Sequence, residues 1–533
     1  MHRLYRYMVI LTALWLMAAP MQADDSLPVI EVGTDRTVIY PQRMDLTGEE
    51  SLMDVLQMMP DRMVAGYEDV IDSYNLRIDN TPMNGDMRLI LSQMKAKDIA
   101  KIQVCDNTGV AKGTIGTAKV LDINMQMPDT VKGIAEGQGG FGEKVEANGT
   151  VNVLYGSRKT DLYANATYRY QEGHLEYLTL HMTNRFDERN KLLTYFTQQY
   201  AGIPDASSQK VMGRARYFHT FNEQGTELLV LGGYQYSTEP LFSSQFPLYV
   251  LELNTPLVPS KRLTLMAGAE GDFLITRQKE SDKSWDVFNN DIYLQFAYSL
   301  PQWRFMVGNR VMFYNYKLMD ADTVQTFFDI RNNTSASVVY LPNSRHQIQA
   351  GYYRKYYNPV YMSLFMESNI LVDEVWAMAK GQLDECDINQ IKLSYAYTKQ
   401  KLTVQTEASY YIVEDQPDFA ELNASAYWRT KWLTLTGGAN VYITKDEPFA
   451  SVRVVPTVWL PRDWQIGLQV VYYTKNAPQR EAYGTPVYLC LSVNKVIKQR
   501  WNIGVDWHDV ADVVCSEAKL NRHAVNVKLQ YRF

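Results

Sequence analysis

The chain has 533 residues, of which 46% are hydrophobic and 12% aromatic, and its 53 basic and 59 acidic residues give a formal net charge of −6. This apolar content excludes a disordered chain, and the negative charge gives no electrostatic reason to bind nucleic acid. Tyrosine is unusually frequent, with 37 residues. Its amphipathic ring is favoured at membrane interfaces and at carbohydrate-binding surfaces.

Residues 1–23 have the pattern of a secretory signal peptide. Arg3 and Arg6 precede an apolar stretch at 8–19, and Ala23 is followed by two aspartates. An uncleaved membrane anchor is the alternative, but a spanning helix needs about 20 apolar residues. We therefore expect export and cleavage after Ala23. The four cysteines have no metal-ligand spacing and are expected to fill apolar space.

After the signal, residues 24–40 are predicted to form a periplasmic N-terminal segment and residues 41–130 a small α/β domain. Thr47 and Glu50 have the spacing of a capping box, which predicts the start of a helix with Leu52, Val55 and Leu56 on one face. Pro60 should end that helix. The remaining elements of this domain are predicted as a strand at 74–79, a helix at 87–94, and strands at 101–105 and 119–125.

Residues 131–533 show the alternation of apolar and polar residues that is typical of strands with one apolar and one polar face. In the last strand Val527 and Leu529 alternate with Asn526 and Lys528. We expect about 22 such strands, each long enough to cross a bilayer. The predicted fold class is thus mainly β, a transmembrane antiparallel barrel after a small α/β domain. An array of soluble β-sandwiches is the alternative, but it should show domain linkers.

The connections between these strands alternate between tight and long, as in a membrane barrel with short periplasmic turns and longer outer loops. The expected tight turns are 156–159, 222–225, 300–303, 341–344, 460–464 and 498–501, and the expected longer connections are 202–209, 237–245, 278–284, 358–387, 475–483 and 509–520. Trp303, Trp432, Trp464 and Trp501 each begin a strand after a tight turn. This position predicts an aromatic belt at the inner interface.

Several segments resemble one known family. The runs SLMDVLQMMPD, YNLRIDNTPMNGDMRLILSQMKAKDIAKIQV and GTIGTAKVLDINM look like the plug domain of TonB-dependent outer-membrane receptors, closest to the short Bacteroidetes-type outer-membrane β-barrel proteins. The barrel and the terminal Phe533 match the same family. The resemblance implies a protein of the Gram-negative outer membrane, surrounded by its lipid, that imports a ligand when TonB pulls on the plug from the periplasm.

Three groups of residues are candidates for function. The extended segment Pro28, Val29, Ile30, Glu31 and Val32 could add as an edge strand to TonB, although it could equally form the first strand of the plug. The aromatic residues Tyr356, Tyr357, Tyr361 and Phe365, at the longest connection, could stack on a ligand or belong to an outer aromatic belt. Tyr531 and Phe533 resemble the terminal signal that the barrel-insertion machinery reads.

No residues suggest catalysis or a cofactor. The seven histidines are scattered, and no nucleophile, zinc or phosphate-binding motif occurs. The methionine-rich segment before residue 130 could suit Cu(I), but core packing explains it better. We therefore expect a non-enzymatic receptor and transporter for an unidentified ligand. The alternative is a surface barrel that does not transport and serves as an adhesin or as a scaffold for a partner protein.

Overall fold

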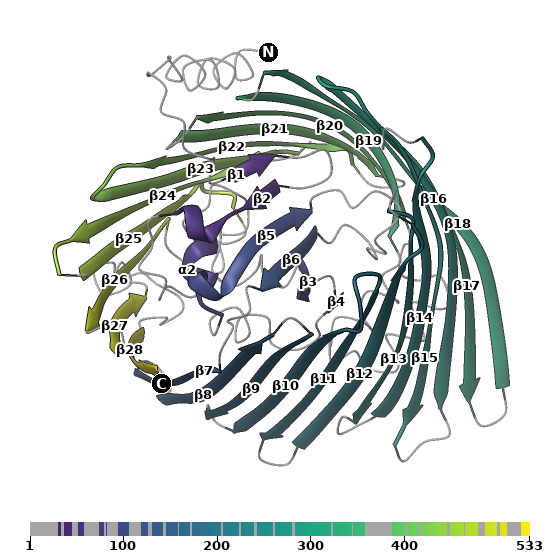
Figure 1. Cartoon of the computed structure of the whole chain (residues 1–533), viewed down its shortest axis with the longest axis horizontal. Coiled ribbons are helices and arrows are strands. Elements are labelled where there is room, and N and C mark those ends of the chain that lie inside the picture. The colour runs from purple at the N-terminus through teal and green to yellow at the C-terminus, as the bar shows by residue number, and fades with distance from the viewer. Residues whose placement is uncertain are drawn as a thin grey trace.

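The computed structural model describes two parts of the chain. The described residues are 30–32, 37–44, 52–57, 74–78, 81–82, 94–105 and 119–125, followed by 131–532 apart from most of the connections between strands, of which 358–385 and 509–523 are the longest. The first part is a small sheet, and the second is a barrel that surrounds it (Figure 1).

The N-terminal part is a mixed sheet with short helical turns. Its described elements are β1 (Ile30–Val32), β2 (Thr37–Ile39), β3 (Tyr74–Ile78), β4 (Thr81–Pro82), β5 (Ile99–Cys105), β6 (Lys119–Met125), the helix α2 (Leu52–Gln57), and the 3-10 turns η1 (Pro41–Arg43) and η4 (Ala96–Asp98). The strand order is β1-β2-β5-β6-β3-β4, with β3 and β6 parallel. The strands predicted near β3, β5 and β6 are confirmed.

The core of this sheet is apolar and includes α2. Leu52 and Val55 on the helix and Ile102 on β5 are each fully buried, which confirms the predicted apolar helix face. The backbone N–H of Leu52 donates to the carbonyl of Met94 over 2.7 Å and ties α2 to the segment before η4. The predicted cap at Thr47 and most of the predicted helix at 87–94 lie outside the described residues.

Among the described residues, no helix combines the length and the apolar composition that crossing a membrane requires.

The second part is a closed antiparallel barrel in which the described residues form 22 strands, each hydrogen-bonded to its neighbours in sequence, with β28 paired to β7. The predicted fold class is confirmed. The strands are β7 (Lys132–Phe141), β8 (Val145–Gly156), β9 (Thr160–Tyr170), β10 (His174–Arg185), β11 (Asn190–Ile203), β12 (Ala206–Thr220), β13 (Glu227–Thr238), β14 (Phe242–Pro256), β15 (Leu263–Gln278), β16 (Ser284–Ser299), β17 (Trp303–Asp320), β18 (Thr323–Asn343), β19 (His346–Tyr357), β20 (Cys386–Lys399), β21 (Leu402–Val413), β22 (Phe419–Arg429), β23 (Leu433–Ile443), β24 (Phe449–Leu460), β25 (Trp464–Tyr473), β26 (Val487–Ile497), β27 (Trp501–His508) and β28 (Ala524–Arg532).

The two faces of the barrel wall have opposite polarity. On β28 the side chain of Leu529 is 47% exposed on the outside, whereas the neighbouring Gln530 is buried in the lumen. On β25 Leu468 is exposed and Gln465 and Gln469 are buried in the same way. Apolar side chains outside and polar ones inside are what a wall in contact with lipid requires. The predicted faces of the last strand are therefore confirmed.

The connections fall at two ends of the barrel. Those after even-numbered strands lie at one end, here called the turn end, and include all six predicted tight turns. Those after odd-numbered strands lie at the opposite end, the loop end, and include the longest, 358–385 and 509–523. In the 222–225 turn, Gly225 adopts a positive φ of 93°, which glycine tolerates without steric strain.

Two of the segments expected to be longer connections are mostly strand instead, so these two predictions are wrong. Residues 202–209 are almost entirely strand, since Gly202 pairs with Ser207 and Ile203 with Ala206. Likewise, 237–245 is mostly paired, with Ser237 opposite Ser244. Serine and glutamine made these segments resemble loops, but their backbone groups are satisfied by the neighbouring strand. The strands here continue beyond the length that a bilayer requires.

The predicted tryptophan belt is present at the turn end. Trp303, Trp464 and Trp501 are each about 40% exposed, on the outer face, and Trp432 is 60% exposed in the turn before β23. The indole of Trp303 stacks on Tyr340 with ring centroids 4.4 Å apart. Amphipathic rings of this kind mark the level at which apolar hydrocarbon meets polar headgroups, so the belt fixes the depth of the turn end.

Candidate functional site

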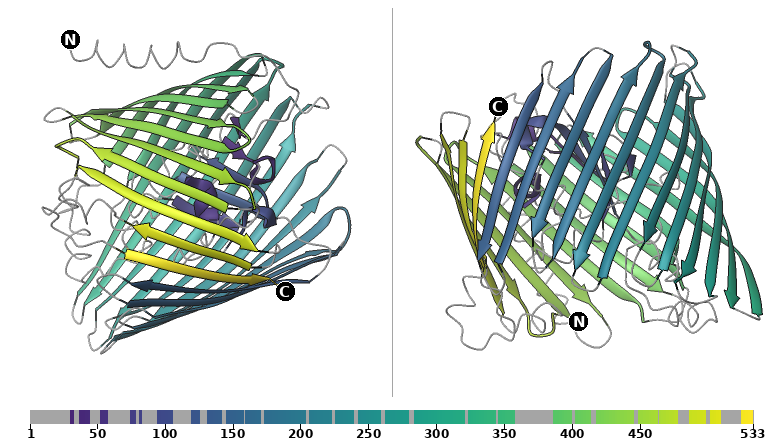
Figure 2. Two further views of the ribbon diagram at one scale, coloured as in Figure 1. Left: turned by 90° about the vertical axis from the view of Figure 1, so that its left-hand side faces the viewer. Right: turned by 90° about the horizontal axis from the view of Figure 1, so that it is seen from below.

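The lumen of the barrel is the candidate functional site, because it holds the N-terminal sheet and buried charged side chains of the wall, among them Arg310, Lys392 and Glu421. The sheet lies inside the ring of strands in both directions of view (Figures 1 and 2). Its edge strand β1 lies beside β20. Movement through the lumen therefore depends on how the sheet is held.

One carboxylate joins the sheet to the wall. The ammonium group of Lys95, just before η4, lies 3.0 Å from a carboxylate oxygen of Glu136 on β7, and the ammonium group of Lys528 on β28 lies 3.3 Å from the other oxygen. The side chain of Lys95 is fully buried, and those of Glu136 and Lys528 are 9% and 13% exposed. We call these three residues the seam triad, because β7 and β28 close the barrel.

The position of the seam triad follows from local structure. Lys95 follows Met94, whose carbonyl accepts the hydrogen bond from α2, so the lysine is held by the core of the sheet. Glu136 and Lys528 occupy lumen-facing positions on the first and last strands, which the register places side by side, with Glu136 opposite Gln530. The fold thus brings one anion and two cations together where the barrel closes.

A second charged cluster lies on the lumen wall far from the seam. Arg310 on β17 donates to Glu270 over 2.6 Å and, through Nε, to Asp291 over 2.8 Å. Its guanidinium also lies 5.3 Å from the ring centroid of Tyr293, whose hydroxyl donates to Glu252 over 2.7 Å. Gly268 makes room for this ring, because a Cβ there would lie 2.4 Å from the Tyr293 hydroxyl. These contacts lock four neighbouring strands together.

The described residues contain no group of three or more histidine, cysteine, aspartate or glutamate side chains that could hold a metal ion. Met44 and Met94, two of the methionines considered for copper, are buried at 3% and 2% exposure in the core of the sheet. They pack as gap-filling apolar side chains do. The other methionine side chains of that argument lie outside the described residues or are not described.

The structure places one of the four predicted ligand-contact side chains. Tyr356 on β19 is 3% exposed. Its ring packs against Tyr314, with centroids 5.5 Å apart, and the guanidinium of Arg331 lies 4.6 Å from its centroid. A ligand could contact it only after these neighbours separate. The side chain of Tyr357 is not described, and Tyr361 and Phe365 lie outside the described residues.

The predicted TonB-contact segment is partly in the sheet. Ile30, Glu31 and Val32 form β1, with Ile30 opposite Ile39 and Val32 opposite Thr37 on β2. This is the alternative in which the segment is the first strand of the plug, and it leaves β1 at the edge of the sheet. Pro28 and Val29 lie outside the described residues.

The predicted assembly signal lies at the turn end of the last strand. The ring of Tyr531 packs against Trp501, with centroids 4.5 Å apart, and Tyr531 is also opposite Ala135 on β7. Phe533 lies outside the described residues.

Sequence reasoning missed the seam triad and the Arg310 cluster. A usable signal was present for the first, because Glu136 and Lys528 sit on the polar faces of the first and last strands, and closing the barrel must bring those strands together. Lys95 gave no comparable signal, since its position depends on how the sheet sits in the lumen.

Comparisons with known proteins give a fold. No protein-family model matches the chain, and no curated protein matches it. Among solved structures, it is similar to the siderophore receptor PirA from Pseudomonas aeruginosa, with a TM-score of 0.68 at 11% identity over 94% of this chain and 100% of that one.

The FrpB iron transporter from Neisseria meningitidis and the copper transporter OprC have TM-scores of 0.66. Their identities are 9% and 11%, over 94% and 96% of this chain and 100% of each of theirs. The expected likeness to Bacteroidetes-type proteins has no support among these structures. The chain has the barrel fold of the TonB-dependent outer-membrane receptors, as the resemblance in its sequence predicted.

Proposed function

We propose that this protein is a receptor of the Gram-negative outer membrane that takes up a ligand through its barrel, driven by TonB. The observation that carries the proposal is the folded sheet inside a closed barrel, held by the buried contact of Lys95 with Glu136. A lumen filled in this way is closed to free diffusion. Transport then requires that the sheet rearrange, and that the rearrangement be supplied with energy.

The turn end faces the periplasm in this proposal, and β1 is the element that TonB would grip. An edge strand has backbone donors and acceptors available on one side, and partners bind such edges by adding a strand. β1 pairs with β2 over only three residues, so little backbone pairing opposes its release. A pull on β1 would transmit force to β2, then to β5, and finally to the segment that carries Lys95.

The ligand is unidentified. Its first candidates are the ferric siderophores and copper named for the structural neighbours. The contact of the buried Tyr356 ring with the partly exposed guanidinium of Arg331 suits an aromatic or anionic group. Radiolabelled ferric enterobactin, ferric alcaligin and copper are therefore the probes to use in a deletion strain and its complemented partner.

Coupling can be tested without knowing the ligand. A photo-crosslinking residue in place of Glu31 should form an adduct with TonB in living cells, and the adduct should persist in the Ile30→Val background. Ile30→Pro removes a backbone donor and should abolish both the adduct and uptake while barrel abundance stays normal. If uptake persists unchanged in Ile30→Pro at normal abundance, coupling runs elsewhere or the barrel is not energised.

A further inference from the structure

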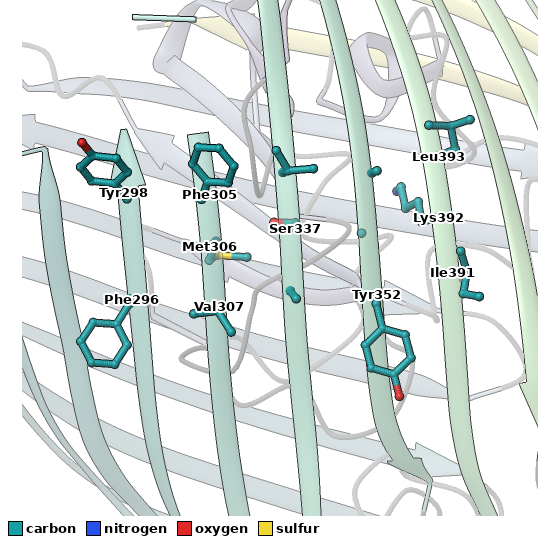
Figure 3. A pocket seen from close by; sticks show the side chains of 14 residues that line it. Phe296, Tyr298, Phe305, Met306, Val307, Ser337, Tyr352, Ile391, Lys392 and Leu393 are labelled. Atoms are coloured by element: carbon teal, nitrogen blue, oxygen red, sulfur yellow. The ribbon is translucent and has the colours of Figure 1, made fainter. Parts of the chain in front are cut away.

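The outer wall of the barrel contains an apolar hollow between β16 and β20. Its volume is about 690 Å³, within the range of about 300 to 1,000 Å³ typical of small-ligand sites. Figure 3 shows the rings of Phe296 and Phe305 on one side and Tyr352 and Ile391 on the other. Between them the outward positions carry smaller side chains, Ala336 and Val338 on β18 and Ala350 on β19.

The hollow occupies one leaflet of the bilayer. It begins just above the belt residue Trp303 and includes Phe305 and Val307, the next outward positions on β17. It ends below a polar group in which Asn309 donates to Asn332 over 2.9 Å and to Thr334 over 3.0 Å. Asn309 stands roughly 14 Å above Trp303, given a rise of about 3.3 Å per residue and a tilt of about 45°. That height is about half of the 30 Å hydrocarbon core.

The rim below the hollow is cationic. Arg345 in the turn before β19 is exposed, and Lys399 ends β20. No aspartate or glutamate occurs in 292–310, 330–357 or 391–404, the segments that form this rim and the hollow above it. By contrast, the turn between β10 and β11 contains Asp187 and Glu188. Cations at the level of the tryptophan belt meet the phosphates of the adjacent leaflet.

We propose that this hollow binds an anionic phospholipid of the periplasm-facing leaflet. One acyl chain lies over Ala336 and Ala350 between the two rows of larger side chains, and the phosphate lies at Arg345 and Lys399. The depth of one leaflet, the apolar lining and the acid-free rim together select this occupant. The choice of the periplasm-facing leaflet rests on the orientation given in the proposed function, but lipid binding on the outside of the wall does not depend on whether the lumen transports.

Native mass spectrometry of the full-length protein tests the site, with dioleoyl phosphatidylglycerol or dioleoyl phosphatidylethanolamine added to the detergent-purified barrel. The wild type should retain phosphatidylglycerol at least ten-fold more strongly than phosphatidylethanolamine. Ala350→Phe fills the hollow with another apolar group and should reduce retention at least ten-fold. Ala426→Phe, the same exchange at an outward position near the turn end of β22, should leave retention unchanged.

The rim is tested separately from the hollow. The double variant Arg345→Gln with Lys399→Gln should keep an acyl-chain adduct but lose the preference for phosphatidylglycerol. Each variant is first shown to be folded by its heat-dependent shift in gel mobility. Equal lipid retention in wild type and Ala350→Phe would overturn the proposal. So would a protein dimer that Ala350→Phe disrupts without any change in lipid, since the hollow would then bind a second copy.

Discussion

The strands at the seam, where β28 pairs with β7, are much shorter than the strands of the wall opposite it. At the seam β27, β28 and β7 have 8, 9 and 10 residues, whereas β17 and β18 have 18 and 21. About 9 to 11 residues suffice to cross a bilayer. The short strands thus only just span the membrane, whereas the long ones continue well beyond it at the loop end of the barrel, as the slanted outline of the barrel shows (Figure 2).

This difference separates two tasks. The short seam holds the sheet through the seam triad, whereas the tall wall has its own charged cluster around Arg310 and the apolar hollow on its outer face. The lumen-facing charges at the seam bind the N-terminal sheet. The lumen-facing charges of the tall wall bind side chains on neighbouring strands of the wall. The same alternation of faces therefore serves attachment on one side and wall rigidity on the other.

Removing the shared carboxylate should have the largest effect. Glu136→Ala takes the partner from two cations, one of them fully buried, and breaking a buried pair from one side costs about 3 to 5 kcal/mol. We expect the sheet to become sensitive to added protease while the barrel stays heat-modifiable. Lys528→Leu leaves the shorter contact with Lys95 in place and should be much milder. Equal protease sensitivity in both variants would mean that the triad does not hold the sheet.

The stability cost of an arginine substitution on the outer face should show how deep that position lies in the bilayer, both at the seam and at the tall wall. Val527→Arg lies deeper in the hydrocarbon than Leu529→Arg, so it should cost more, up to about 2 to 4 kcal/mol, whereas Leu529→Arg, nearer the tryptophan belt, should cost less. Val324→Arg should cost almost nothing, because Val324 at the loop end of β18 stands roughly 35 Å above Tyr340 by the rise and tilt of a barrel strand. Urea unfolding in lipid vesicles gives these differences. A large effect at Val324 would place the tall strands inside the membrane.

Deleting Phe533 should lower the amount of folded barrel in the membrane, because this residue follows the strand that closes the seam and resembles the signal for the insertion machinery. Quantifying the heat-modifiable band in outer-membrane fractions measures the effect. A matched truncation cannot be made at the tall wall, so Phe328→Ala serves as the control for loss of one exposed aromatic ring there. Normal levels without Phe533 would remove it from this role.

The sequence predicted what depends on neighbouring residues and missed what depends on distant ones. Period-two alternation predicted the strands and their faces, and Leu529 lies outside as expected. The turns and the tryptophan belt also follow from local pattern. Residues 202–209 resemble a longer connection in composition, and composition does not reveal that β11 and β12 pair through this segment. The contact of Lys95 with Glu136 depends on the docking of two separately patterned parts, which no local window contains.

The seam triad also implies an order of assembly. Lys95 and Glu136 are 41 residues apart in the chain, whereas Lys528 comes from the last strand, and contacts between nearby residues form before those that close long loops. The sheet can therefore be held by β7 before the barrel exists. When β28 pairs with β7, Lys528 meets a Glu136 carboxylate that Lys95 already orients. The last contact of the closing barrel therefore forms best when the sheet is correctly docked.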